Sequence, residues 1–192
     1  MTFSAVILSA GNSSRMGRDK AFMEFNGQVL LARQIATVRA AAAVEIFISG
    51  RPDTDYSAFG VRVLHDRVPG AGPLAGIHAA LLAAQSPRLL ALAVDLPEIG
   101  SEFLRALAKK SASAGGVIPR VAGQVEPLAA IYPISAREIA GTMLREKEFA
   151  VRSFARACVA AGQASFADFP AEIAPWFKNL NSPSDLTSES AR

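Results

Sequence analysis

The sequence is poor in the side chains that build transition-metal centres, with one cysteine and two histidines in 192 residues. A lone cysteine excludes an intramolecular disulfide, and His65 and His78 without a cysteine cluster do not make a zinc site. Gly-x-Ser-x-Gly, the nucleophile elbow of serine hydrolases, is also absent. Cys158 shares an apolar helical face with Val151 and Phe154, which predicts a buried structural thiol and not a nucleophile.

Long apolar runs are missing as well. The alanine-rich stretches 40–44 and 79–84 are much shorter than the roughly 20 apolar residues that cross a bilayer. Residues 1–4 carry no basic segment of the kind that opens a secretory signal. We therefore expect a cytoplasmic protein with no membrane partner.

Charge of one sign is scarce too, since 20 Lys and Arg face 17 Asp and Glu, for a net charge of +3. This small excess, without stripes of alternating basic and aromatic residues, argues against a nucleic-acid partner. A content of 51% hydrophobic and 19% charged residues excludes a disordered chain. The length corresponds to about 1.3 typical domains, and no repeat or low-complexity linker divides it, so we expect one domain over 1–192.

Short apolar runs alternate with helical patterns in the first part of the chain. Strands are expected at 5–9, 45–49, 61–65 and 89–94, and helices at 28–42, at 73–85 and from an N-cap at Ser101. This alternation predicts an α/β fold with a doubly wound, mainly parallel, Rossmann-like sheet. Pro73 directly after Gly72 suits the first position of its helix.

The second half of the chain changes character. Segments 117–119 and 128–132 flank Ala122-Gly123, which predicts a small antiparallel excursion. Helices are expected at about 136–145 and 149–161. The aromatic residues that follow are interpreted as core and lid packing: Phe166, Phe169, Trp176 and Phe177.

Polar residues follow each expected strand of the first half. Ligands of doubly wound sheets bind outside the carboxyl ends of the strands, so these endings are the first candidates for a site. They are residues 9–20, Ser49-Gly50, His65-Asp66 and Asp95.

The first of these endings carries three cations in six residues, Arg15, Arg18 and Lys20. Gly11 and Gly17 allow backbone amides to turn toward an anion, and the cations suit polyphosphate oxygens. Neither common phosphate fingerprint is present, neither the P-loop nor Gly-x-Gly-x-x-Gly. The pattern favours a polyphosphate-binding loop, and the alternative is an ordinary solvated loop.

Asp95 follows a buried strand, where a carboxylate must be paired, protonated or bound to metal. Mg²⁺ held by one or two carboxylates and by substrate phosphates is one solution, and a helix cap or structural aspartate is another. Turn chemistry explains Asp66 almost as well as a site does.

Together these segments resemble the molybdenum cofactor guanylyltransferase family, within the larger group of nucleotidyltransferases. The resemblance runs from residue 6 to residue 186. It rests on LSAGNSSRMGRDK at 8–20, GPLAGI at 72–77, VDLP at 94–97, EPLA at 126–129 and NLNSPSDL at 179–186.

The resemblance implies transfer of GMP from GTP to the terminal phosphate of molybdopterin, with Mg²⁺ as cofactor and pyrophosphate as leaving group. It also implies delivery of the product to a molybdoenzyme or its chaperone. The implied nucleotide-binding residues are Leu8, Ser9, Ala10, Gly11, Lys20, Ser49, Asp66 and Asp95. The implied catalytic residues are Arg15, Lys20 and Asp95, with Asp95 on the metal, and the implied pterin-side residues are Asn179 and Asn181.

One departure bears on the base. The guanylyl-specific motif usually reads Leu-Ala-Gly-Gly, whereas this chain has Ser9-Ala10-Gly11 after Leu8, closer to the cytidylyltransferase form. One methyl group is worth about 1–3 kcal/mol of discrimination, and the segment 72–76 follows the guanylyl form, so GTP is favoured. The alternatives are a CTP-dependent molybdopterin cytidylyltransferase, a related nucleotidyltransferase, and a non-catalytic nucleotide-binding accessory protein for molybdoenzyme maturation.

Overall fold

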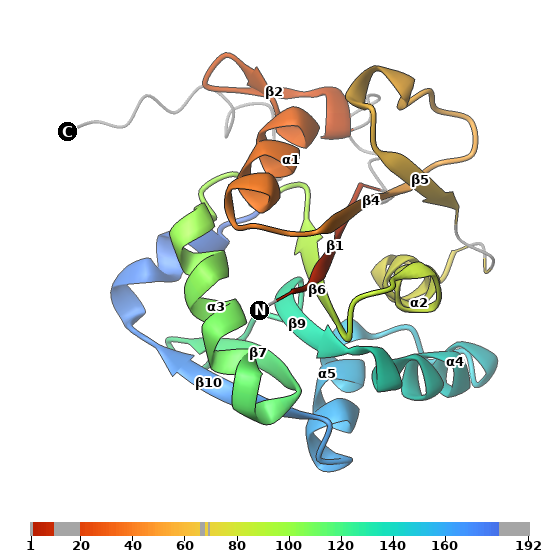
Figure 1. Ribbon diagram of the computed structural model, residues 1–192, viewed down its shortest axis with the longest axis vertical. Coiled ribbons are helices and arrows are strands. Elements are labelled where there is room, and N and C mark those ends of the chain that lie inside the picture. The colour runs from red at the N-terminus through yellow and green to blue at the C-terminus, as the bar shows by residue number, and fades with distance from the viewer. Residues whose placement is uncertain (1, 10–19, 66–67, 69, 181–192) are drawn as a thin grey trace.

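The computed structural model describes residues 2–9, 20–65, 68 and 70–180. Its centre is an eight-stranded sheet in the order β10-β7-β9-β6-β1-β4-β5, with β8 paired to β7 (Figure 1). The strands of this sheet are β1 (Ser4–Leu8), β4 (Glu45–Gly50), β5 (Arg62–His65), β6 (Arg88–Ala93), β7 (Gly116–Val121), β8 (Gln124–Val125), β9 (Ala129–Pro133) and β10 (Ala164–Phe169). A separate antiparallel pair is formed by β2 (Glu24–Phe25) and β3 (Gln28–Val29).

Helices cover both faces of the sheet (Figure 1). The α-helices are α1 (Leu30–Ala40), α2 (Pro73–Ala83), α3 (Ser101–Ala114), α4 (Arg137–Arg145) and α5 (Val151–Ala160). The 3₁₀ helices are η1 (Lys20–Phe22), η2 (Ser57–Phe59), η3 (Ile134–Ala136) and η4 (Ala171–Phe177). The mainly parallel, doubly wound sheet expected from the sequence is confirmed.

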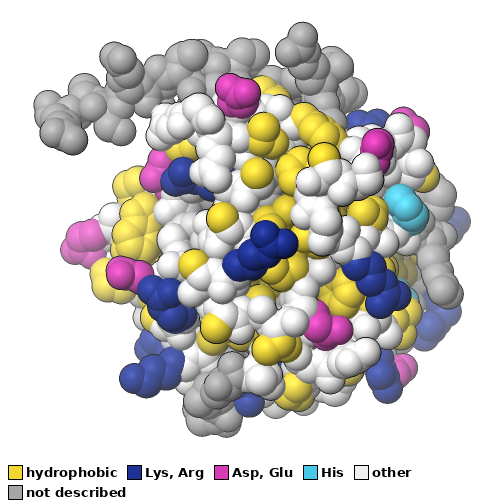
Figure 2. Space-filling view, turned by 45° about the horizontal axis from the view of Figure 1, so that its top comes forward, with side chains coloured by type: hydrophobic (Ala, Val, Ile, Leu, Met, Phe, Trp, Pro, Cys, Tyr) yellow, Lys and Arg dark blue, Asp and Glu magenta, His cyan; other side chains and the backbone are white. Residues whose placement is uncertain are grey.

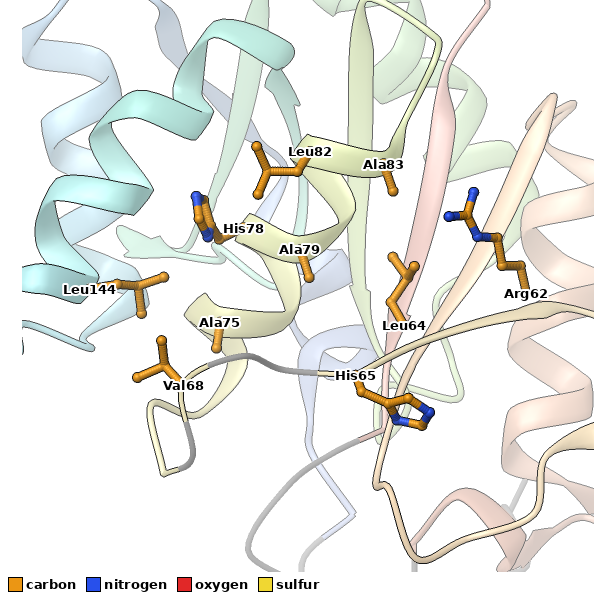
Figure 3. A pocket seen from close by; sticks show the side chains of 10 residues that line it. All are labelled: Arg62, Leu64, His65, Val68, Ala75, His78, Ala79, Leu82, Ala83 and Leu144. Carbon is orange, nitrogen blue, oxygen red and sulfur yellow. The ribbon is translucent and has the colours of Figure 1, made fainter.

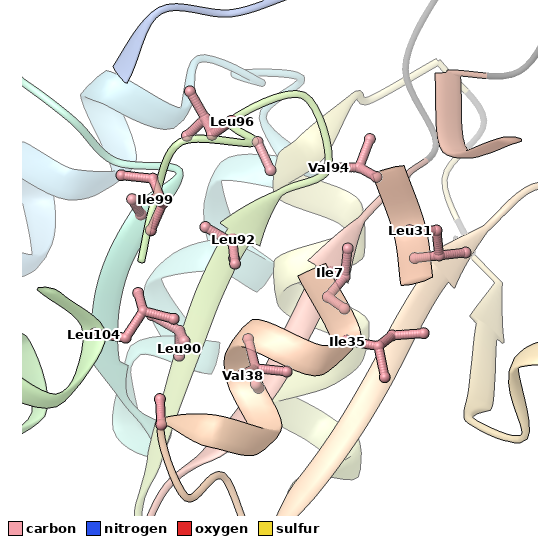
Figure 4. Packing of buried hydrophobic residues seen from close by; sticks show 14 of the residues in the cluster. Ile7, Leu31, Ile35, Val38, Leu90, Leu92, Val94, Leu96, Ile99 and Leu104 are labelled. Atoms are coloured by element: carbon pink, nitrogen blue, oxygen red, sulfur yellow. The ribbon is translucent and has the colours of Figure 1, made fainter. Parts of the chain in front are cut away.

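The central strands alternate their side chains between two hydrophobic clusters. In β1, Ala5 and Ile7 belong to the cluster under α1 and α3, whereas Val6 and Leu8 belong to the cluster under α2, α4 and α5. Figure 4 shows Leu31, Ile35 and Val38 of α1 and Leu104 of α3 gathered around Ile7, Leu90 and Leu92 of the sheet. A strand buried on both faces reads as a continuous apolar run, which is why its sequence pattern is so clear.

The antiparallel excursion is also confirmed. The strand β9 runs antiparallel to both β6 and β7, and β8 pairs antiparallel with β7 around Ala122-Gly123. Ala122 and Gly123 both have positive φ, at 47° and 78°, as a tight two-residue turn requires.

Two expectations about helix starts are wrong. The helix expected at 28–42 begins at Leu30, because Asn26 and Gly27, with φ of 50° and 73°, form a tight turn that commits Gln28-Val29 to β3. Ser101 is not an N-cap but the first residue of α3. Gly100 takes the N-cap position instead, with extended φ and ψ of −91° and 158° and no side-chain hydrogen bond.

The aromatic tail contains a strand that the sequence pattern did not predict. Phe166 and Phe169 lie in β10, which pairs in parallel with β7, and Trp176 and Phe177 lie in η4. The ends of the other expected strands and helices differ from the observed ends by at most two residues. No helix in the described ranges is long and apolar enough to cross a membrane.

Cys158 lies on the buried face of α5 beside Phe154, fully shielded from solvent, as the sequence predicted. Burial raises the pKa of its thiol to about 12. At pH 8 only about one such thiol in ten thousand would be ionised, and the thiolate is the reactive form.

We therefore expect a disulfide reagent such as DTNB to label the native protein at least about 100-fold more slowly than the protein in denaturant. Release of the coloured thiolate, followed by absorbance at pH 8, measures both rates. The denatured protein, with one cysteine, serves as the control and should give one equivalent. Equally fast labelling of the native chain would contradict the buried position.

Candidate functional site

Three of the expected site residues meet where the central parallel strands end. Leu8 at the end of β1 is in register with Ser49 of β4 and with Ala93 of β6. Ser9 directly after β1 donates both its backbone N–H, at 3.1 Å, and its hydroxyl, at 2.7 Å, to the carbonyl of Ser49. Ser9 and Ser49 are both buried. Together with Leu8 they connect the ends of β1 and β4, and we call these three residues the floor of the site.

Lys20 and Asp95 form an ion pair at the same edge, although 75 residues separate them in the chain. Nζ of Lys20 lies 3.1 Å from Oδ2 of Asp95, and both side chains are about one-fifth exposed, at 20% and 19%. The carboxylate at the end of a buried strand is thus paired, one of the three states that its position allows.

Each member of this ion pair is held by the fold around it. Lys20 opens η1, whose next residue, Ala21, is fully buried in the core under α1. The loop after Asp95 is tied to α1, because Gln34 donates to the carbonyl of Leu96 and Arg33 to the carbonyl of Pro97, both at 2.7 Å. These contacts hold both charged residues at the same edge of the sheet.

A third segment joins the pair from the far end of the chain. Leu180 accepts a hydrogen bond from Lys20 Nζ on its carbonyl at 2.7 Å and donates its N–H to the carbonyl of Asp95 at 3.1 Å. Asn179, the preceding residue, is exposed beside this contact. Sequence patterns did not identify Leu180, because both contacts are made by backbone groups and such contacts do not depend on the type of side chain.

The first turns of α2 press closely on the floor of the site. A Cβ added at Gly76 would lie 2.3 Å from Oγ and 2.9 Å from Cβ of Ser49, and 3.0 Å from Cδ2 of Leu8. A glycine is therefore required there for close approach. Pro73 occupies the first helical position after Gly72, as expected, and Gly72 has a positive φ of 62°.

The connection between β8 and β9 also reaches this edge. The backbone N–H of Ala93 donates to the carbonyl of Leu128 at 2.8 Å, which places Glu126-Pro127-Leu128 beside the end of β6. Burial raises the pKa of Glu126, and the positive charge of Arg152 opposes this shift. The sequence pointed to this segment without assigning a role to Glu126.

Several expected site residues lie outside the described residues. They are Ala10, Gly11, Arg15, Asp66 and Asn181. The structure brings together Leu8, Ser9, Lys20, Ser49, Asp95 and Asn179, with Leu180 added to them.

A cavity of about 270 Å³ lies to one side, between β5 and α2. Figure 3 shows mostly apolar side chains around it, including Leu64, Ala79 and Leu82, with His65 and His78 on opposite sides. Neither Lys20 nor Asp95 lines this cavity. We therefore place the candidate site at the strand ends and not in the cavity.

Basic side chains are not concentrated on the face that Figure 2 shows. There, the described Lys and Arg side chains are spread among acidic, hydrophobic and uncharged groups. The described residues thus form no extended basic surface on this face.

Mg²⁺ fits the donor set at Asp95. In the part of the chain that the structure describes, no three His, Cys, Asp or Glu side chains gather into an all-protein metal cluster. Mg²⁺ commonly takes one or two carboxylates and completes its shell with water and substrate phosphates, so one partly exposed carboxylate suffices for that mode of binding.

Comparison with known proteins decides the family. The model of the MobA-like NTP transferase domain matches residues 5–162. A probable molybdenum cofactor guanylyltransferase of Opitutus terrae is 37% identical over 186 residues, which cover 95% of this chain and 92% of that protein. The chain belongs to the molybdenum cofactor guanylyltransferase family. The molybdenum cofactor guanylyltransferase of Rhizobium meliloti is 34% identical over 203 residues, covering 97% of this chain and 90% of the relative.

Solved structures share the guanylyltransferase family's fold. Molybdopterin-guanine dinucleotide biosynthesis protein A of Archaeoglobus fulgidus gives a TM-score of 0.74 at 22% identity, covering 97% of this chain and 95% of that one. A 2-C-methyl-D-erythritol 4-phosphate cytidylyltransferase of Thermus thermophilus gives 0.74 at 20% identity, covering 97% and 96%. The same fold therefore occurs in one protein named for a guanine dinucleotide and in another named as a cytidylyltransferase.

The close approach at Gly76 yields a test of the site's floor. Gly76→Ala should destabilise the protein by about 1–3 kcal/mol, because Ser49 and Leu8 must shift to admit the methyl group. Urea denaturation measures this loss, and calorimetry with GTP should show weaker binding.

Gly100→Ala is the matched control, since no described heavy atom beyond Gly100 and its two chain neighbours lies within 4 Å of its added Cβ. It should leave GTP binding unchanged and cost less stability, as alanine is only a poorer N-cap than glycine. Equal effects of the two substitutions on GTP binding would contradict the expected role of Leu8 and Ser49 in contacting the nucleotide.

Proposed function

We propose that this protein transfers GMP from GTP to the terminal phosphate of molybdopterin, forming molybdopterin guanine dinucleotide and releasing pyrophosphate. The observation that supports this most directly is the Lys20–Asp95 ion pair beside the carboxyl ends of β1 and β6, where a cation and a carboxylate lie together. The names of the relatives at 34–37% identity supply the nucleotide and the acceptor.

The reaction needs no protein nucleophile. The acceptor phosphate oxygen is already anionic at neutral pH, so it can attack the α-phosphorus of GTP without a general base. A new P–O bond forms there, and the bond from the α-phosphorus to the oxygen bridging to the β-phosphate breaks, with pyrophosphate leaving. The protein is left with alignment and with neutralisation of negative charge.

The charged residues at the strand ends match those two tasks. Lys20 presents its ammonium to the triphosphate, with Arg15 as a second cation from the preceding segment of the sequence. Mg²⁺ held by Asp95 and phosphate oxygens would supply further charge neutralisation at the reacting phosphates. Leu8, Ser9, Ala10, Gly11, Ser49 and Asp66 are the proposed nucleotide contacts, and Asn179 and Asn181 the proposed pterin contacts.

Lys20 and Asp95 are hydrogen-bonded partners in the structure. Both change partners in this proposal, the ammonium toward phosphate oxygens and the carboxylate toward Mg²⁺. Each charge therefore stays compensated before and after binding, which avoids an unpaired charge in a partly buried position. We further propose a cytoplasmic location and delivery of the product to a molybdoenzyme or its chaperone.

One observation favours a second candidate. Ala10 stands where the guanylyl motif usually has glycine, as in the cytidylyltransferase form, so a CTP-dependent molybdopterin cytidylyltransferase is the alternative.

Asp95→Asn should lower pyrophosphate release by at least about 100-fold, because it removes the charge that holds Mg²⁺ while keeping the side-chain shape. A coupled pyrophosphate assay with GTP, molybdopterin and Mg²⁺ measures the loss, and the melting temperature should stay within a few degrees. Asp168→Asn is the control, since Asp168 is 72% exposed in a surface pair with Arg120. Normal turnover of Asp95→Asn would exclude the metal assignment.

The choice of base is tested by giving the protein molybdopterin, Mg²⁺ and one nucleoside triphosphate at a time. We expect pyrophosphate from GTP and not from CTP, ATP or UTP. Release with CTP alone would establish the cytidylyltransferase alternative. Binding of GTP without any release would instead point to a non-catalytic accessory protein.

A further inference from the structure

The C-terminal segment contacts the Lys20–Asp95 pair through two backbone groups of Leu180, its carbonyl and its N–H. The carbonyl of Leu180 lies 2.7 Å from Nζ of Lys20, shorter than the 3.1 Å between Nζ and Oδ2 of Asp95. The N–H of Leu180 donates a hydrogen bond to the backbone carbonyl of Asp95 at 3.1 Å. Leu180 therefore touches the backbone of one charged residue and the ammonium of the other.

The side chain of Leu180 is fastened in the core. It is 7% exposed and belongs to the same hydrophobic cluster as Leu96, Ile99 and Phe103, which follow Asp95 along the chain. Its backbone is thereby fixed relative to the strand end that carries Asp95.

An aromatic anchor precedes Leu180 in the chain. The rings of Phe177 and Trp176 in η4 contact Phe103 of α3 edge-on, with centroids 5.4 and 6.4 Å apart. Phe169 of β10 lies 5.0 Å from the same ring. Aromatic contacts of this kind add to the burial of area, so η4 is attached to α3 independently of the site.

Fixing the ammonium has a definite physical benefit. A lysine side chain has several rotatable bonds, and ordering it costs conformational entropy. The carbonyl of Leu180 and the carboxylate of Asp95 both hydrogen-bond to Nζ, so the lysine side chain is already ordered before the substrate binds. This is preorganisation, and it reduces the entropy lost on binding. A carbonyl oxygen without charge competes weakly for the ammonium against a phosphate oxygen, so it orients Lys20 without trapping it.

We propose that Leu180 is a positioning residue whose peptide groups orient Lys20 for the triphosphate, with Phe177 anchoring the segment that carries it. This inference rests on the proposed function, in which Lys20 binds the triphosphate, and it assigns that contact to the β- and γ-phosphates. It gives the C-terminal segment a role in holding the nucleotide as well as a role on the pterin side.

The test compares the affinities for GTP and for GMP, which share guanine, ribose and α-phosphate and differ in the phosphates assigned to Lys20. Calorimetry in EDTA excludes any contribution from metal. Wild-type protein should prefer GTP, and Lys20→Met should lower the GTP-to-GMP affinity ratio by about tenfold or more, as expected for a lost charge-assisted hydrogen bond.

Leu180→Ala should lower the same ratio by about three- to tenfold while the affinity for GMP changes less than about twofold. Leu180→Met, which keeps the side-chain volume, should restore the wild-type ratio. Phe177→Ala should act in the same direction as Leu180→Ala and covers the case in which that variant does not fold.

Leu107→Ala is the stability-matched control. Leu107 is fully buried in the same cluster, on α3, and has no part in the site, so its truncation should lower the melting temperature without changing the ratio. A merely structural role of Leu180 would weaken GTP and GMP binding equally.

The failures of the two proposals are distinguishable. If wild-type protein binds no GTP, the proposed function is wrong and the inference falls with it. If wild type prefers GTP and Lys20→Met removes that preference, while Leu180→Ala and Phe177→Ala keep it, only the inference is overturned.

Discussion

Parallel pairing of β1 with β4 on one side and with β6 on the other determines where the candidate site lies. Leu8 is in register with Ser49 and with Ala93, so three chain segments end at one level of the sheet. The polar residues that follow these ends need not be close in sequence to meet. Successive side chains of β1 lie in opposite hydrophobic clusters, and this alternation fixes the register. A slip of one residue would move every side chain of β1 into the other cluster.

The ion pair between Lys20 and Asp95 depends on this framework. A carboxylate at the end of a buried strand has to be compensated, and the lysine that compensates it comes from an element tied to α1. The same requirement makes the pair suited to phosphate chemistry, since each member already has a partner that a phosphate or a metal ion can replace. The scarcity of cysteine and histidine is consistent with this, because a pre-ionised phosphate acceptor needs no side-chain nucleophile or base.

Sequence patterns predict those parts of the fold in which burial dominates. The strands β1, β4 and β6 are continuous apolar runs, and α5 shows its apolar face through Phe154 and Cys158. The strand β10 was missed because its pairing with β7 is a tertiary contact that its mixed burial does not reveal. Residue types also indicated Lys20 and Asp95, but not that they bond to each other, and the backbone role of Leu180 carries no side-chain pattern at all.

The antiparallel strand β9 adds a different way of supplying residues to the same edge. A parallel strand contributes the residues after its end, whereas a strand of opposite direction contributes those before its start. Glu126-Pro127-Leu128 accordingly lies beside Ala93 although β9 points away from the site. In the proposed function, the residues that follow β1 and β4 contact the nucleotide, whereas Asn179 of the C-terminal segment contacts the pterin. The proposed function requires two phosphorylated substrates to lie side by side, and a sheet that changes direction next to β6 would offer each of them a separate set of loops.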